Sequence, residues 1–262
     1  MATELQSHPE PAAPAPAAPG ADVRLAHLSF SYRTERGEQL PALCDLTLGV
    51  GAGQTLAVVG PSGCGKSTLL ELLCGLATPA AGSIQAPPAV LMPQRDLLLP
   101  WLSALDNAAL ALRIAGLSRA QARRRAHDLF CELGLQGFQR ARPRELSGGM
   151  RQRVAFLRTL LSGKPLLCLD EPFGALDALT RGEMQEWLAA TLAREPRTVV
   201  LVTHDVEEAI LLADRVVVLS QRPGRVIADL ALDAPRPRGR TDAVSVALRE
   251  RVLGELAQGM RR

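Results

Sequence analysis

Several features that would place the chain in a common class are missing. No apolar run approaches the roughly 20 residues that a transmembrane helix requires, so we expect any membrane association to come through a partner. The formal net charge is only +3, which gives no reason to expect nucleic acid as a partner. The five cysteines are scattered without a C-x-x-C pair. This argues against a zinc site or a disulfide framework and suits a reducing cytoplasm.

The first residues also lack the pattern of a secretory signal peptide. Glu4 and Glu10 lie there, and a tract of proline and alanine from residue 9 to residue 20 stands where an apolar segment would be needed. Proline and alanine in this arrangement offer no periodic apolar face. We therefore expect residues 1–21 to form a disordered tail.

The rest of the chain alternates between strand-like and helix-like patterns. Residues 23–50 alternate between apolar and polar, and residues 55–59 form a short apolar run that ends at a glycine. Strands that alternate with helices predict an α/β fold around a mainly parallel sheet. Further strands are expected at 83–85, 89–92, 166–169, 198–202 and 216–219. Helices are expected at 66–74, 103–115, 119–133, 149–161, 176–193 and 206–213.

The middle third of the chain is entirely helical in pattern. We expect residues of about 95–163 to form a helical subdomain inserted into a main domain of residues 22–238. Ser118 is placed to cap a helix, and Asp205 with Glu208 resembles a capping box. The pattern of residues 239–262 predicts an amphipathic helical extension with a stripe of four apolar residues. These are Val244, Leu248, Val252 and Leu256.

The strongest local signal is a glycine-rich segment between an expected strand and an expected helix. It matches the pattern G-x-x-x-x-G-K-[ST], in which backbone N–H groups and a helix N-terminus surround phosphate oxygens. Lys66 is expected to reach the β and γ phosphates of a nucleotide, and Ser67 to bind Mg²⁺. The segment consists of Gly60, Pro61, Ser62, Gly63, Cys64, Gly65, Lys66, Ser67 and Thr68.

Two carboxylates follow an apolar run at residues 166–169. Asp170 and Glu171 are expected at the carboxyl edge of the sheet, where α/β folds bind ligands. Downstream of a phosphate loop, Asp170 is expected to hold Mg²⁺, and Glu171 to polarise the attacking water as a general base.

A second anion-binding helix start is indicated further along the chain. Ser147, Gly148 and Gly149 precede a helical pattern and are expected to leave N–H groups and a hydroxyl facing outward. One nucleotide does not need two such sites within one chain. The segment is therefore expected to serve the nucleotide of another subunit.

In this order, these segments resemble the ATP-binding-cassette (ABC) ATPases over residues 24–238. The resemblance implies a P-loop NTPase core with an N-terminal antiparallel β-subdomain and an inserted α-helical subdomain. It also implies ATP and Mg²⁺ as cofactors and a homodimer that encloses them. Tyr32 looks like the aromatic that stacks on adenine, with Phe30 as a weaker competitor, and Asp177 like the loop that crosses to the partner subunit. Gln94 looks like the glutamine that senses Mg²⁺ and the permease, and His204 like the histidine that contacts the γ-phosphate.

Two further segments are similar to importers of nitrate, sulfonates, taurine and related small molecules. They are residues 97–101, which read Leu-Leu-Leu-Pro-Trp, and the arginine- and proline-containing residues 222–225 together with 235–238. This resemblance implies integral-membrane permease subunits, a solute-binding protein as an indirect partner, and a peripheral position on the cytoplasmic face of the inner membrane. A soluble ABC ATPase acting on nucleic acid or ribosomes and an exporter-type ATPase are the alternatives.

Three further sequence features give expectations that the structure can test. Trp101 is either exposed at a permease interface or a core residue of the helical subdomain. Cys64 stands beside a helix N-terminus, a position expected to lower its pKa and make it reactive. The run of arginines at residues 123–125 is read as a solvated helix face, with lipid headgroups or a permease loop as the alternative contact.

Overall fold

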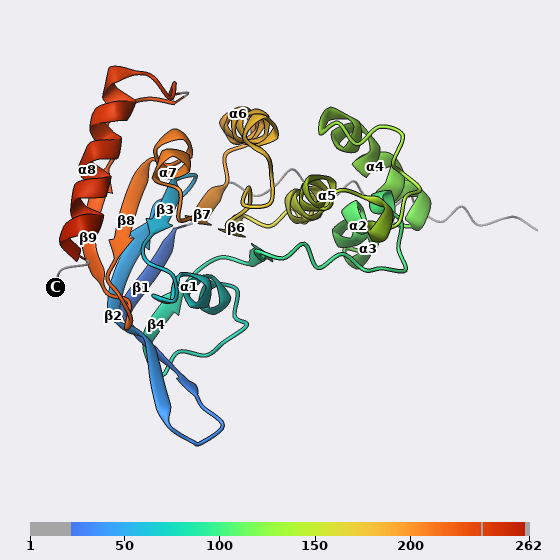
Figure 1. Cartoon of the computed structure of the whole chain (residues 1–262). Coiled ribbons are helices and arrows are strands. Elements are labelled where there is room, and N and C mark those ends of the chain that lie inside the picture. The colour runs from blue at the N-terminus through green and yellow to red at the C-terminus, as the bar shows by residue number, and fades with distance from the viewer. Residues whose placement is uncertain (1–21, 237, 260–262) are drawn as a thin grey trace, which may run out of the picture.

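The computed structural model describes residues 22–236 and 238–259, so the expected tail at residues 1–21 lies outside it. A six-stranded sheet forms the centre of the fold (Figure 1), and its neighbouring strands are parallel except for β9, which is antiparallel to β8. The predicted α/β class with a mainly parallel sheet is therefore confirmed. In spatial order the strands are β5 (Ala89–Met92), β6 (Leu166–Asp170), β7 (Thr198–Val202), β3 (Thr55–Val59), β8 (Arg215–Leu219) and β9 (Val226–Ala231).

The central strands are apolar along their whole length because both faces of the sheet are covered. All five residues of β3, β6 and β7 are buried, as expected for parallel strands between layers of helices. Helix α1 packs under β5, β6 and β7, whereas α7 packs over β3 and α8 against β8 and β9 (Figure 1). These helices are α1 (Lys66–Leu73), α7 (Val206–Leu212) and α8 (Ala243–Gly259), and α6 (Ala178–Arg194) shares a core cluster with β6 and β7.

A separate antiparallel sheet lies beside the first helix. Its strand order is β2-β1-β4, and both pairings are antiparallel. The long hairpin of β1 and β2 projects at the bottom of Figure 1. The apolar residues of this sheet share a core cluster with those of β3 and α1. The sheet therefore packs against α1. The strands are β1 (Val23–Arg33), β2 (Gln39–Val50) and β4 (Ala81–Gln85).

Short helices gather at the other end of the molecule, away from α8 (Figure 1). They pack around Phe130 and Phe156, which are 0% and 1% exposed, and Phe156 also meets the rings of Phe173 and Trp187. This core is continuous with that of β6 and α6. The elements are α2 (Ala104–Ala108), α3 (Leu110–Ile114), α4 (Arg119–Glu132), η1 (Pro143–Glu145) and α5 (Gly148–Leu160).

Three details of the predicted elements are wrong. The helix expected at residues 103–115 is interrupted at Ala109, so it forms α2 and α3. Strand β9 was not predicted, because it lies at a sheet edge where only Leu230 of the strand is buried and the alternation is weak. Val244 is 55% exposed and does not belong to the apolar stripe of α8, whereas Leu248, Val252 and Leu256 pack on the sheet.

Candidate functional site

The glycine-rich loop connects the end of β3 to the first residue of α1. Gly63 and Gly65 adopt φ values of +76° and +104°, a region that side chains disfavour. A Cβ atom on Gly65 would lie 2.7 Å from the carbonyl oxygen of Ala42. Gly65 is also the N-cap of α1, and no side chain caps the helix start. The loop therefore leaves N–H groups at a positive helix end available to an anion.

The ammonium group of Lys66 lies across this loop. Its Nζ atom donates hydrogen bonds to the carbonyl oxygens of Gly60 at 2.7 Å and Pro61 at 2.9 Å. The lysine is only 8% exposed, and these bonds satisfy two of its three donors. The loop thus holds a largely desolvated cation beside the free N–H groups, which is the donor set that a polyphosphate requires.

The aromatic residue Tyr32 reaches the first turn of α1 from β1. Its hydroxyl lies 2.7 Å from the Thr68 hydroxyl, and its ring makes an edge contact with Phe30 at 5.0 Å. Tyr32 is 41% exposed, whereas Phe30 is half-buried and packs on the core. Of the two candidates, Tyr32 is therefore the ring available for stacking beside the loop.

Asp170 ends β6 next to the hydroxyl of Ser67. The carboxyl is 8% exposed, and burial raises its pKa, while a hydrogen bond with Ser67 opposes that shift. A carboxylate and a hydroxyl from two different elements thus meet at the loop. Oxygen donors of this kind, together with phosphate oxygens, are the set that Mg²⁺ prefers, so these two residues fit such an ion.

Three residues that follow neighbouring strands come into contact at the Glu171 side chain. Gln94 follows β5, Glu171 follows β6 and His204 follows β7. The Gln94 amide donates to one carboxylate oxygen at 2.8 Å, and His204 Nδ1 lies 3.0 Å from the other. The three side chains, far apart in sequence, come together because the carboxyl ends of parallel strands share one edge of the sheet.

The backbone at Glu171 is strained, with φ at +45°. A left-handed conformation costs about 1–3 kcal/mol for a residue other than glycine. It is held by a hydrogen bond from Glu171 N–H to the Val202 carbonyl at 2.8 Å and by one from Gly174 N–H to the Glu171 carbonyl at 3.1 Å. The turn therefore fixes the direction of the carboxylate toward Gln94 and His204.

The second expected anion site is an exposed helix start. Ser147 caps α5 by accepting from Met150 N–H at 3.2 Å, and Ser147 and Gly148 are exposed. Gly149 is half-buried, and a Cβ there would come within 3.2 Å of Leu176. No hydrogen bond between residues 147–149 and the glycine-rich loop occurs among the described residues. Asp177 is also exposed and caps α6 through Thr180 N–H at 3.1 Å.

The expectation of a reactive Cys64 is wrong. The thiol is 1% exposed and belongs to the core cluster under the loop. Burial raises its pKa and outweighs the opposing influence of Lys66. The helix N-terminus was visible in the sequence, but the inward direction of the side chain was not.

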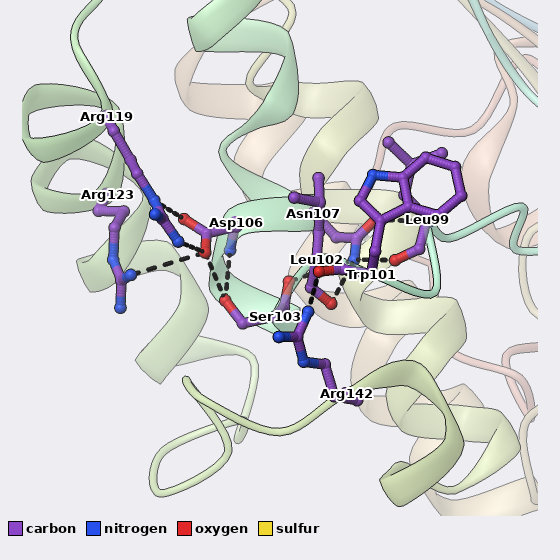
Figure 2. Close-up of polar contacts among 9 residues, drawn as sticks. All are labelled: Leu99, Trp101, Leu102, Ser103, Asp106, Asn107, Arg119, Arg123 and Arg142. Atoms are coloured by element: carbon purple, nitrogen blue, oxygen red, sulfur yellow. Dashed lines mark hydrogen bonds and ion pairs between the residues drawn. The ribbon is translucent and has the colours of Figure 1, made fainter.

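Trp101 is 66% exposed, so the alternative of a core tryptophan is wrong. Its loop is nevertheless firmly held, as Figure 2 shows. The fully buried Asn107 donates to the carbonyl of Leu99 at 3.1 Å and accepts from the N–H of the same residue at 2.8 Å. The Arg142 guanidinium donates to the carbonyl of Trp101.

A basic hollow of about 310 Å³ adjoins the tryptophan. The carboxylate of Asp106 accepts from Arg119 and lies 3.6 Å from Arg123 (Figure 2). The arginine run is therefore not uniformly solvated: Arg123 is in an ion pair, whereas Arg124 and Arg125 are exposed. The hollow is lined by Trp101, Ser103, Asp106, Arg119, Arg123, Arg140 and Arg142.

Two residues near the site were missed or misread from the sequence. A Cβ on Gly224 would lie 2.2 Å from the Cys64 carbonyl, so the turn before β9 packs directly on the glycine-rich loop. The capping box at α7 is only half formed. Asp205 caps the helix, but Glu208 accepts from the Thr203 hydroxyl at 3.1 Å instead of reaching back. The alternation of residue types carried no signal for either contact.

A glycine-rich loop between a parallel strand and a helix, facing carboxylates on a nearby strand, defines a P-loop NTPase. A family model described as ABC transporter matches residues 43–174. The aliphatic sulfonates import ATP-binding protein SsuB 1 of Rhodococcus jostii is 45% identical over 82% of this chain and 87% of its own. The taurine import ATP-binding protein TauB of Pseudomonas aeruginosa is 41% identical over 89% and 92%. The chain belongs to the ABC transporter family, as one of its ATPases.

A solved structure supports the same assignment. The ATP-binding cassette MJ0796, in a dimeric post-hydrolysis state bound to ADP and Pi, matches with a TM-score of 0.74 and 28% identity. The match covers 81% of this chain and 100% of that one. An inward-facing putative metal-chelate type ABC transporter matches with a TM-score of 0.67 and 26% identity, over 78% and 82% of the two chains. No helix in the described ranges is both long and apolar enough to cross a bilayer.

The buried carboxyl of Glu208 predicts a pH effect on stability. Burial raises its pKa from 4.5 to about 8, so between these values the folded chain binds more protons than the unfolded chain. Raising the pH across this window therefore lowers the free energy of unfolding. Glu208→Gln cannot ionise, and we expect its stability relative to wild type to rise with pH, by at most about 5 kcal/mol.

Urea unfolding of both proteins from pH 5 to pH 9 measures this effect. The exposed Glu183→Gln on α6 is the matched control and should follow the wild-type curve. Parallel pH curves for wild type and Glu208→Gln would show that Glu208 ionises normally in the folded chain.

Proposed function

We propose that this chain is the ATP-hydrolysing subunit of an ABC importer that energises uptake of a small solute through a separate permease. The observation that carries the proposal is the convergence of Gln94, Glu171 and His204 beside the glycine-rich loop. Relatives that are 41–45% identical bear the names of taurine and aliphatic sulfonate import ATP-binding proteins. We therefore assign the solute to the sulfonate, taurine or nitrate class of small anions and zwitterions.

The loop binds the nucleotide in this proposal. The N–H groups of residues 60–68 and the Lys66 ammonium bind the phosphates, and the exposed ring of Tyr32 stacks on the base. Ser67 and Asp170 would hold Mg²⁺, and Gln94 is assigned to the same ion as a further oxygen donor. When bound, the ion neutralises charge that develops on the phosphate oxygens.

Hydrolysis is assigned to the three side chains at the ends of β5, β6 and β7. The Glu171 carboxylate accepts a proton from the attacking water and orients it. His204, on the far side of that carboxylate from Gln94, donates a hydrogen bond to the γ-phosphate. The strained but anchored turn at Glu171 keeps the base in place before the nucleotide arrives, so little reorganisation is needed during the reaction.

The exposed helix start at residues 147–149 completes the site of a second copy. Among the described residues it makes no hydrogen bond to the loop of its own chain, yet it has the N–H groups of an anion site. In a head-to-tail homodimer, Ser147, Gly148 and Gly149 meet the γ-phosphate held by the partner, and Asp177 crosses the same interface. Each nucleotide then lies between two chains, so ATP drives closure of the dimer.

The permease is assigned to the surface around Gln94 and Trp101. Tryptophan, tyrosine and arginine are enriched at interaction hot spots, and here Trp101 stands on a braced loop beside a hollow that is lined by arginines. We propose that the helical subdomain, residues 95–163, moves with dimer closure and carries the permease with it. The subunit then lies on the cytoplasmic face of the inner membrane, and a solute-binding protein delivers cargo to the permease.

Glu171→Gln tests the site and the dimer together. The amide keeps the shape of the side chain but cannot act as a base, so we expect hydrolysis to fall by about 10²–10⁴-fold. ATP binding should survive, because Lys66, Ser67 and Asp170 are unchanged. The variant should shift from monomer to dimer with Mg-ATP but not Mg-ADP in size-exclusion chromatography with light scattering.

Two further variants complete that experiment. Glu183→Gln on the exposed face of α6 should hydrolyse ATP normally. Ser147→Arg in the Glu171→Gln background should abolish the dimer shift by blocking the partner's anion site. Normal hydrolysis by Glu171→Gln would remove this residue from the reaction.

Trp101→Ala tests the permease surface. We expect solute uptake by the complete transporter to fall by about 30-fold or more, since loss of a hot-spot tryptophan costs at least about 2 kcal/mol of binding. Basal ATPase activity of the isolated subunit should change less than about twofold. Ile114→Ala, an exposed residue of the same lobe, is the control. Unchanged uptake, or loss of both activities together with a lower melting temperature, would contradict the assignment.

A further inference from the structure

Arg181 links two segments of the site that follow different strands. It lies in the first turns of α6, directly after the turn that carries Leu176 and Asp177. Its Nη2 atom donates to the Leu176 carbonyl at 3.1 Å, and its Nη1 atom lies 3.7 Å from Asp205 Oδ2. A guanidinium group holds both donors in one rigid plane. The guanidinium therefore links the turn after β6 to the loop after β7 at this point.

The residue that Arg181 contacts is itself immobilised. Asp205 Oδ1 accepts from the N–H groups of Glu207 at 2.9 Å and Glu208 at 3.3 Å, and Asp205 N–H donates to the Thr203 hydroxyl at 2.9 Å. The same hydroxyl donates to the buried Glu208. The residues on both sides of His204 are thus held by hydrogen bonds, and Arg181 connects this loop to the turn at Leu176.

The side chain of His204 has few contacts among the described residues. It is 67% exposed and contacts Glu171 at 3.0 Å. In the described part of the chain, two side-chain contacts of this kind join the segment at 171–181 to the loop at 203–205: His204 with Glu171, and Arg181 with Asp205. The hydrogen bond from Glu171 N–H to the Val202 carbonyl anchors the base of this loop, and a second side-chain contact restricts the direction in which its tip points. Arg181 supplies the second contact.

Part of the Arg181 side chain is buried without a hydrogen-bond partner among the described residues, which lowers the stability of the folded chain. The buried, unpaired donor is the Nε atom. The side chain is about one-third exposed, so its ion pair with Asp205 alone contributes little to stability. Stability is therefore a poor explanation for an arginine at this position.

We propose that Arg181 is a positioning residue for hydrolysis, which transmits the position of the turn at Leu176 and Asp177 to His204 through Asp205. This inference rests on the proposed function, in which Asp177 meets the partner subunit and His204 meets the γ-phosphate. When the partner docks on the turn, the Leu176 carbonyl, the guanidinium and Asp205 move as one unit. The histidine then reaches its working position only in the assembled dimer.

The test is a double-mutant cycle on the purified full chain. Arg181→Ala is made alone and in the His204→Ala background, and single-turnover hydrolysis of radiolabelled ATP is measured for each protein. Alone, Arg181→Ala should lower the hydrolysis rate at least about tenfold, with ATP affinity within about twofold of wild type. In the His204→Ala background it should have no further effect, because a residue that acts only through His204 has nothing left to position.

Matched variants separate positioning from folding. Arg194→Ala removes an exposed arginine from the end of the same helix and should behave as wild type. Arg181→Lys keeps the charge but cannot span both partners with fixed geometry, so it should restore less than half of the lost rate. If Arg181→Ala fails to fold, the cycle is run with Arg181→Lys in its place.

Two results would overturn the proposal. One is an equal loss of rate in both backgrounds, which would mean that Arg181 acts independently of His204. The other is a normal rate for Arg181→Ala. Failure of the proposed function would appear differently, as absence of ATP hydrolysis by the wild-type chain or indifference of wild-type hydrolysis to Glu171→Gln.

Discussion

The carboxylate of Glu171 is the contact on which the site depends. It receives the Gln94 amide on one oxygen and His204 on the other, so it joins the ends of three adjacent parallel strands. Its backbone is held in a left-handed conformation by bonds to β7 and to Gly174. The parallel sheet, buried on both faces, supplies the fixed edge that makes this arrangement possible.

The parts of the site that were predicted from the sequence are those with short-range patterns. The glycine-rich loop is contiguous, and its glycines are required by backbone geometry at Gly63 and Gly65. Asp170 and Glu171 follow directly after an apolar strand, whereas His204 was assigned only through the resemblance to the ABC ATPases. For the loop and the two carboxylates, a few neighbouring residues define both the local conformation and the expected chemistry.

The features that were missed depend on contacts between distant segments. The pKa of Cys64 is raised because its thiol turns into the core, which the adjacent helix start does not reveal. Gly224 touches the Cys64 carbonyl from a turn about 160 residues away in the sequence. Glu208 matched a capping pattern, but the Thr203 hydroxyl bound it instead. Such competition among partners is decided by the tertiary structure.

The central claim is that each nucleotide site is built from two chains. One chain contributes the glycine-rich loop, and the other contributes the helix start at residues 147–149. A chain with Ser62→Cys in the loop is mixed with a chain carrying Ser147→Cys at the helix start, and the mixture is oxidised with and without Mg-ATP. The account predicts a cross-linked dimer that forms only in the mixture and only with Mg-ATP. Wild-type chain treated in the same way is the control for the native cysteines. Absence of that dimer, together with an internal cross-link in a chain bearing both cysteines, would contradict it.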